Sequence, residues 1–242
     1  MVTTINTVAV VGYESCSEQD TITALEILRG AAMVLAGQIA PWPPTQPTRK
    51  LDVKLVSMTP GNIKMQMGTQ VVPDAVLGDQ DLFDLLYVPG GVGSGAMTKN
   101  QAMLKTIQRH YNAGKVVASN CSGVGILFRA GILGKNPVTC VAAIARKMRA
   151  AGVNVPEHRR MWVGVPDARI WTATGSYGVN GGTVAMVAHY FGQDVGTIVS
   201  MMFDTLGGIG NSIFEDQGPE YFFHPDLEAK FQDYFEPTLL PE

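Results

Sequence analysis

The pattern of hydrophobic and polar positions predicts strands and helices that follow one another along most of the chain. Short runs rich in β-branched and large apolar residues are typical of strands, and they occur at residues 7–11, 51–57, 82–88, 115–120, 161–165 and 170–173. Longer segments with one apolar face predict helices at residues 18–35, 100–113, 142–151, 182–191 and 194–206, with another beginning near Ser122. Residues 64–72 indicate a short hairpin or edge pair.

Strands that alternate with helices predict an α/β fold with a doubly wound, mostly parallel sheet sandwiched by helices. We assign residues 1–206 to this domain and residues 207–242 to a C-terminal extension. The extension is rich in aromatic residues, so we expect it to pack on its own domain or on a partner subunit. Residues 39–49 contain four prolines and are predicted to form a surface excursion, because proline interrupts both helices and central strands.

Composition narrows the class of protein. The chain has 242 residues, of which 46% are hydrophobic and 16% charged, as expected for a globular domain. Its net charge of -3 gives no electrostatic case for nucleic acid or an anionic membrane as a partner. The first apolar run, residues 8–11, is too short for a signal peptide or a membrane span. Three cysteines, an odd number, favour thiols in a reducing compartment, and we expect the cytoplasm.

Cys121 is the principal candidate for chemistry. It follows a β-branched run and precedes small residues and an apolar segment, a pattern that predicts a sharp turn from strand to helix. At a helix N-terminus, the helix dipole and backbone amides favour the nucleophilic thiolate. The alternative is a small cysteine packed beneath a helix.

Three predicted strands end near Gly12, Val88 and Asn120, and their loops are expected to meet at one edge of the sheet. The first loop brings Asp20, whose carboxyl can exchange a proton with Cys121 or, alternatively, cap the following helix. The second brings Gly90 and Gly91, whose amides, with that of Ser122, could bind a developing oxyanion. A plain tight turn is the other interpretation of these glycines.

With these residues in place, the chain resembles the DJ-1/PfpI superfamily, which has a flavodoxin-like fold close to class I glutamine amidotransferases. Residues 88–91 resemble its oxyanion loop, residues 121–123 and 131–133 its cysteine elbow and following helix, and residues 19–26 its acidic segment. Asp20 matches the isonitrile hydratase branch, as do residues 170–175 and 178–180, where Asn180 stands at a position often held by aspartate.

Many relatives carry a histidine about twenty residues after the cysteine, whereas this chain has Thr139, Cys140 and Val141 there. The histidines at positions 110, 158, 189 and 224 lie elsewhere, so the resemblance implies a Cys-Asp pair in place of a Cys-His triad. Cys140 either lines the pocket or fills the core, and of these two alternatives we favour the core. Cys16, on the first loop, is either a pocket wall or a second reactive thiol.

The resemblance implies a cofactor-independent lyase similar to isonitrile hydratases, with Cys121 as nucleophile and Asp20 as acid and base. Its substrate would be a small molecule, and its assembly a homodimer. Alternatives are glyoxalase- or deglycase-like carbonyl chemistry, a different reaction on a larger metabolite, and a non-catalytic redox-sensing module. The chain shows no metal-ligand cluster or phosphate loop, so neither a metal nor a nucleotide is predicted.

Overall fold

The computed structural model describes residues 4–39, 47–175, 177–203 and 225–242. Most of the proline-rich segment, the end of the helix predicted at residues 194–206, and His224 therefore lie outside the described residues. So does the first half of the C-terminal extension.

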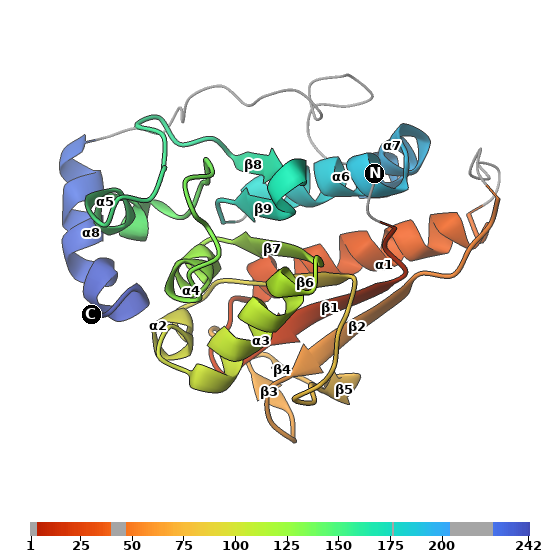
Figure 1. Cartoon of the computed structure of the whole chain (residues 1–242), viewed down its shortest axis with the longest axis horizontal. Helices are drawn as coiled ribbons and strands as arrows, with labels where there is room; N and C mark the ends of the chain where they lie inside the picture. Colours follow the sequence, from red (N-terminus) through yellow and green to blue (C-terminus); the bar gives the residue numbers. More distant parts are fainter. Residues whose placement is uncertain (1–3, 40–46, 176, 204–224) are drawn as a thin grey trace.

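Most strands of the described chain form one sheet in the order β5-β2-β1-β6-β7-β9-β8 (Figure 1). All its neighbouring pairs run parallel except β8 and β9, which are antiparallel. The central strands are buried on both faces, because helices cover the sheet from either side. The strands are β1 (Thr7–Gly12), β2 (Asp52–Ser57), β5 (Ala75–Val76), β6 (Leu85–Val88), β7 (Val116–Asn120), β8 (Trp162–Val165) and β9 (Ile170–Ala173). A separate antiparallel hairpin consists of β3 (Ile63–Lys64) and β4 (Gln70–Val71).

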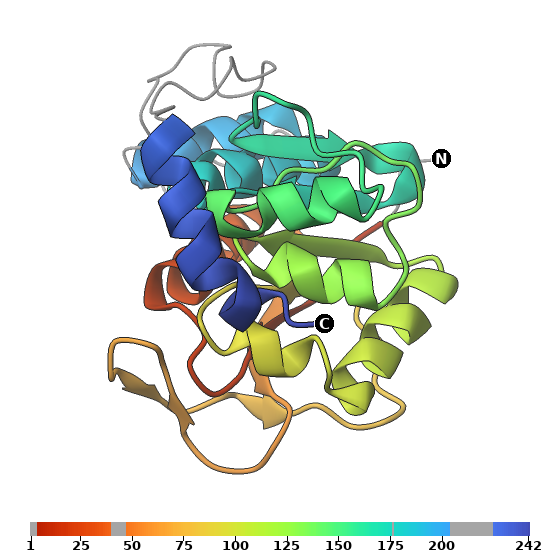
Figure 2. The same ribbon diagram turned by 90° about the vertical axis from the view of Figure 1, so that its left-hand side faces the viewer.

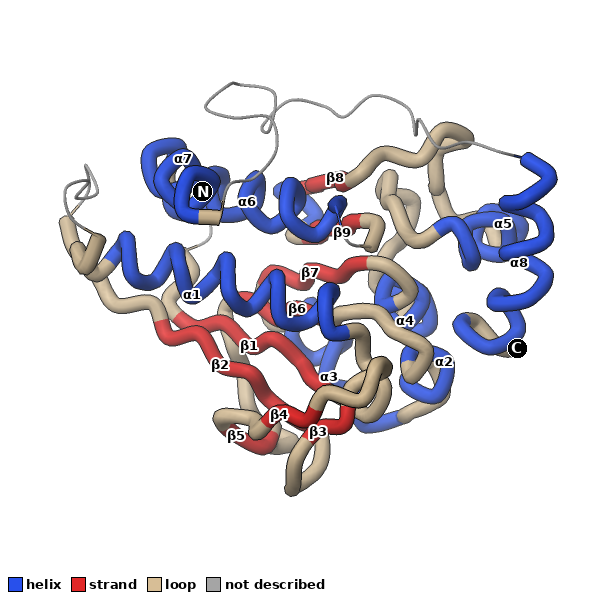
Figure 3. Tube along the Cα trace, turned by 180° about the vertical axis from the view of Figure 1, so that it is seen from behind, coloured by secondary structure: helices blue, strands red, loops and turns tan. Residues whose placement is uncertain are grey.

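The helices form two layers. One face of the sheet is covered by α1 (Ala24–Leu35), α6 (Tyr177–Phe191) and α7 (Gln193–Met202), which lie in front of it in Figure 3. The other face carries α3 (Gln101–Asn112) and α4 (Gly123–Arg129), and beside them lie α2 (Ser94–Met97), α5 (Ala142–Ala150) and α8 (Pro225–Leu239). The doubly wound, mostly parallel α/β fold is thus confirmed.

Local differences from the predicted elements have physical causes. The helix expected at residues 18–35 begins with a π-helix, η1 (Gln19–Thr23), and only then becomes α1. Helix α6 begins at Tyr177, five residues earlier than expected, and its first turn packs against the segment just before β8, where Gly178 lies next to the carbonyl of Met161. The edge strand β5 and the short helix α2 were not predicted, since two- and four-residue elements leave no periodicity to detect.

Parallel pairing brings the carboxyl ends of β1, β6 and β7 to one edge of the sheet. The loops after Gly12, Val88 and Asn120 therefore meet, as the sequence predicts. In the described part of the chain, no helix combines the length and the apolar character needed to span a membrane.

Candidate functional site

Cys121 occupies a strained turn between β7 and α4. Its φ is 51°, a left-handed conformation that is uncommon for any residue other than glycine. Backbone hydrogen bonds hold it on both sides: its N–H donates to Ala173 O at 2.9 Å, and its carbonyl accepts from Val141 N at 3.3 Å. The predicted elbow is therefore present, and the neighbouring strand and the start of α5 fix its geometry.

The turn is tight because Gly123 lies directly against the end of β6. A Cβ atom at this position would come within 2.5 Å of Pro89 O and 2.6 Å of Val88 O. Any side chain here would push the cysteine turn away from the loop that follows β6. The small residues after Cys121 thus bring two loops into contact, which the sequence indicated only as a local turn.

The carboxyl group of Asp20 is the partner of the Cys121 thiol. Asp20 lies on η1, is 2% exposed, and accepts a hydrogen bond from the thiol. Gly90 lies between the two, since a Cβ atom there would be 2.6 Å from Cys121 Cβ and 2.9 Å from Asp20 Oδ2. On another side, a Cβ atom on Gly175 would be 3.5 Å from Cys121 Sγ and 3.6 Å from Asp20 Oδ1. Two glycines therefore leave the room that this pair needs.

The expected thiolate at Cys121 is not what the structure favours. Burial raises the pKa of this thiol well above its ordinary value, and the negative charge of Asp20 raises it further. The Ser122 N–H lowers the pKa, but it is outweighed. Helix α4 has only seven residues, so its dipole lowers the pKa of the Cys121 thiol weakly. The carboxylate of Asp20, in direct contact with the thiol, raises this pKa more strongly. The direction of this shift favours the protonated thiol, which donates a hydrogen bond to the Asp20 carboxyl group.

The amides of Gly90 and Gly91 are engaged within the protein, contrary to the oxyanion role expected for them. Gly90 N–H donates to Asn120 Oδ1 at 2.9 Å, and Gly91 N–H donates to Ser122 Oγ at 3.0 Å. Ser122 Oγ in turn donates to Gly91 O at 3.0 Å. The loop is therefore stabilised against the elbow, and the Ser122 amide, directed at the sulfur, is the remaining donor of the three.

Asn120 connects all three loops of the site. Its side-chain amide donates to Asp20 O at 2.9 Å and to Tyr87 Oη at 3.0 Å, while its carbonyl oxygen accepts from Gly90. The side chain is fully buried, so each of these bonds replaces water that the groups would otherwise need. Asn120 is thus a positioning residue that keeps Asp20 and Gly90 next to Cys121.

We expect Asn120→Ala to destabilise the fold by about 2 to 4 kcal/mol, because it leaves the Gly90 N–H and the Asp20 carbonyl buried without this partner. Urea unfolding measures the change, and Asn112→Ala, on the exposed end of α3, is the matched control. Equal stability of the two variants would show that the three-loop network does not stabilise the site.

A pocket of about 520 Å³ opens above the thiol. Residues of the first loop and η1 form one part of its wall, and the β3–β4 turn and the loop after β6 form another. The elbow at Cys121, the loop after β9, the residue before α5 and helix α8 form the rest. The lining residues are Ser17, Glu18, Gln19, Asp20, Gln66, Met67, Gly91, Val92, Cys121, Ser122, Val141, Gly175, Phe235 and Leu239. Its volume suits a small organic molecule.

Other predicted candidates lie away from this pocket. Cys16 and Cys140 are both 0% exposed, belong to the hydrophobic core and are not among the residues that line this pocket. Asn180 lies on α6 and is not among the lining residues. Of the described histidines, none lines the pocket, and His110 is buried beneath β6, where its Nε2 accepts from Phe83 N–H.

Sequence reasoning missed Asn120, Gly175 and Tyr13 as parts of the site. Tyr13 Oη donates to Pro89 O at 2.7 Å and so fixes the loop that carries Gly90. Asn120 directly precedes the candidate nucleophile, and a polar side chain at the end of an apolar strand was a signal for it. Gly175 lies in the loop after β9, on the same edge of the sheet, which was a signal once the strand order was known.

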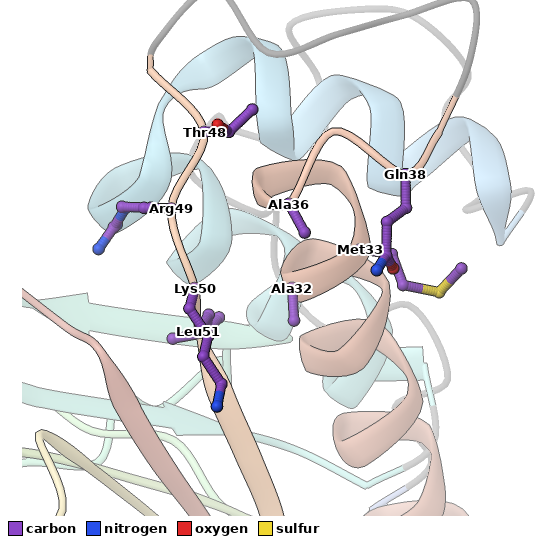
Figure 4. Close-up of a pocket in the computed structure, with 8 residues that line it drawn as sticks. All are labelled: Ala32, Met33, Ala36, Gln38, Thr48, Arg49, Lys50 and Leu51. Atoms are coloured by element: carbon purple, nitrogen blue, oxygen red, sulfur yellow. The ribbon is translucent and has the colours of Figure 1, made fainter.

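A second pocket, of about 470 Å³, lies at the opposite edge of the sheet, between the end of α1 and the start of β2 (Figure 4). The described residues that line it include no cysteine, histidine or carboxylate. Arg49, one of its two cationic side chains, already donates to Ile5 O and Asn6 Oδ1. Within the described residues, no three cysteine, histidine or acidic side chains gather closely enough to hold a metal ion. Of these two pockets, the one at Cys121 is therefore the one lined by a thiol and by carboxyl groups.

Comparison with known proteins agrees with this architecture. Deglycase TK1284 from Thermococcus kodakarensis is 31% identical over 103 residues, which are 42% of this chain and 62% of the relative. The match thus spans about three fifths of that relative's length. A ThiJ/PfpI family protein from Pseudomonas syringae superposes with a TM-score of 0.72 at 17% identity, covering 99% of this chain and 90% of the other. Drosophila melanogaster DJ-1beta superposes with a TM-score of 0.70 at 17% identity, covering 83% of this chain and 98% of the other.

These two structural matches show the fold. The model of the DJ-1/PfpI family matches residues 6–179, which contain Asp20, the loop after β6, and the elbow with Cys121. With the match covering well over half of the sequence, the chain belongs to the DJ-1/PfpI family.

Proposed function

We propose that this protein is a cysteine-dependent enzyme that hydrates an isonitrile to the corresponding N-substituted formamide. The observation that carries the proposal is the burial of the Asp20 carboxyl group against the Cys121 thiol, in the space left by Gly90 and Gly175. Such a pair can deliver both a nucleophile and a proton to the same carbon, which is what addition to the terminal carbon of an isonitrile requires.

In the proposed reaction, Asp20 takes the thiol proton while Cys121 Sγ bonds to the isonitrile carbon. Asp20 then gives that proton to the same carbon, so that a thioimidate forms on the sulfur. Water adds to the thioimidate carbon, and the nitrogen becomes protonated. The carbon–sulfur bond then breaks, the sulfur recovers a proton through Asp20, and the formamide leaves. The sum is addition of one water to one isonitrile, with no oxidant and no cofactor.

The engaged amides of Gly90 and Gly91 support this reaction over carbonyl chemistry. Attack on an aldehyde places negative charge on oxygen, which oxyanion donors stabilise strongly. Attack on an isonitrile is instead completed by protonation of carbon, a step suited to Asp20. The pocket lining within the described residues also has no histidine to move a proton between the carbons of a 2-oxoaldehyde.

A second candidate is deglycase- or glyoxalase-like chemistry on a carbonyl substrate. It is favoured by the 31% identity to a deglycase, although that match covers 42% of this chain. In this reaction Cys121 would add to the aldehyde carbon as a hemithioacetal.

The experiment is a direct comparison of the two substrates with the purified protein. We expect cyclohexyl isonitrile to give N-cyclohexylformamide with turnover, measured by mass spectrometry, and methylglyoxal to give no lactate. Lactate without formamide would reject the hydratase proposal in favour of carbonyl chemistry. Neither product above the buffer control would contradict both.

A further inference from the structure

Helix α8 is held against the domain by ion pairs and by hydrogen bonds between its side chains and the backbone of α5. Arg146 on α5 lies 2.8 Å from Asp233 Oδ1 and 3.5 Å from Glu236 Oε1. Glu236 Oε2 also accepts from Lys147 N–H at 3.1 Å, and Gln232 Nε2 donates to Ala142 O at 3.1 Å. The helix crosses α5 and reaches α2 in Figure 2. It lies beyond residue 179, where the match to the family ends.

Two glycines, in α2 and α4, lie directly beneath the C-terminal end of this helix. A Cβ atom on Gly95 in α2 would come within 1.8 Å of Thr238 O, and one on Gly125 in α4 would lie 3.1 Å from Leu240 Cδ1. Leu240 is 0% exposed. The surface beneath α8 is therefore shaped for close contact, and the helix has a defined position relative to the elbow that α4 follows.

This position brings Phe235 and Leu239 into the lining of the pocket that contains Cys121. Leu239 is 6% exposed, and Phe235 packs against the hydrophobic core. With Val141 from the start of α5, they form an apolar wall, whereas the first loop and η1 contribute polar groups. We propose that α8 sets the substrate specificity of this site, with Phe235 and Leu239 binding an uncharged, apolar substituent of the substrate.

The charges of the pocket agree with this choice. Among its described lining residues are two carboxylates, Glu18 and Asp20, but no lysine, arginine or histidine. An anionic substituent, such as a phosphate or carboxylate, would be repelled and would find no cation to bind. The volume of about 520 Å³ leaves room for an alkyl or aryl group beside the reacting carbon. The inference rests on the proposed function for its reacting carbon.

The first test is a selectivity ratio for the proposed reaction. We expect wild type to have a higher kcat/KM for cyclohexyl than for methyl isonitrile, and Leu239→Ala to lower this ratio about tenfold because it removes apolar contact surface. Leu239→Met, similar in volume, is expected to keep the ratio, as is Thr238→Ala, an exposed neighbour on the same helix. Circular dichroism of each variant verifies the fold.

The second test needs no turnover. Alkylation of Cys121 by N-cyclohexylmaleimide and by N-methylmaleimide is followed by peptide mass spectrometry, and we expect the cyclohexyl-to-methyl rate ratio to fall about tenfold in Leu239→Ala. If this ratio falls while no isonitrile is consumed, the specificity wall is supported and the hydratase proposal fails. A maleimide ratio that is unchanged or increased in folded Leu239→Ala overturns the inference, because the wall would then be inert or only an obstacle.

Discussion

Replacing Cys121 with alanine is expected to lower turnover at least ~10³-fold, because the proposed reaction forms its covalent bond to this sulfur. The substitution removes only the sulfur from a partly buried side chain whose backbone is held by Ala173 and Val141, so the elbow should persist. Formamide production from cyclohexyl isonitrile measures the loss, and circular dichroism measures the fold.

Cys140→Ala is the matched control for this substitution. It removes a thiol that is 0% exposed in the core and absent from the pocket lining, so turnover should stay close to that of wild type. Turnover in Cys121→Ala above about a tenth of the wild-type rate would contradict the covalent mechanism. It would leave the carboxyl groups of Asp20 and Glu18, the two acidic side chains among the described lining residues, to activate water directly.

Asp20→Asn is expected to separate reactivity of the thiol from catalysis. The Asp20 charge raises the pKa of the Cys121 thiol, so its removal should lower that pKa and increase the thiolate fraction at a fixed pH. Alkylation of Cys121 by iodoacetamide at pH 8 should then become faster, because a lower pKa leaves a larger fraction of the thiol as thiolate at this pH. Turnover should instead fall ~10²- to 10⁴-fold, because the amide cannot carry the proton to the isonitrile carbon.

Glu14→Gln provides the comparison for the lost charge. Glu14 is exposed on the same loop and is not among the pocket-lining residues, so its neutralisation should change neither rate. An alkylation profile that does not move to lower pH in Asp20→Asn would show that this carboxylate does not control the thiol. Faster alkylation with unchanged turnover would remove Asp20 from the acid–base role while keeping its electrostatic one.

The elbow at Cys121 and the meeting of the three loops followed from local pattern. The run before Cys121 and the small residues after it predict a turn between strand and helix, and the order of strands and helices predicts a sheet whose loops share an edge. The elbow depends on neighbours in the sequence, and the shared edge follows from the alternation of strands and helices along the chain, so the sequence by itself indicated both. It also singled out Asp20, since the resemblance of residues 19–26 to the family placed a carboxyl beside the cysteine.

Only the tertiary structure decided the state of the thiol and the shape of the pocket. The pKa of Cys121 responds to its own burial and to the carboxylate of Asp20, which is far away along the chain. The direction of the pKa shift therefore depends on how deeply the thiol is buried and how close the two side chains lie, and no local sequence pattern contains either. The engagement of the Gly90 and Gly91 amides likewise depends on partners in another loop. Residues 207–242 were expected only to pack on their own domain or on a partner subunit, and no helix was predicted there. The place of α8 over the pocket is decided by surfaces on α2, α4 and α5, which exist only once the domain has folded.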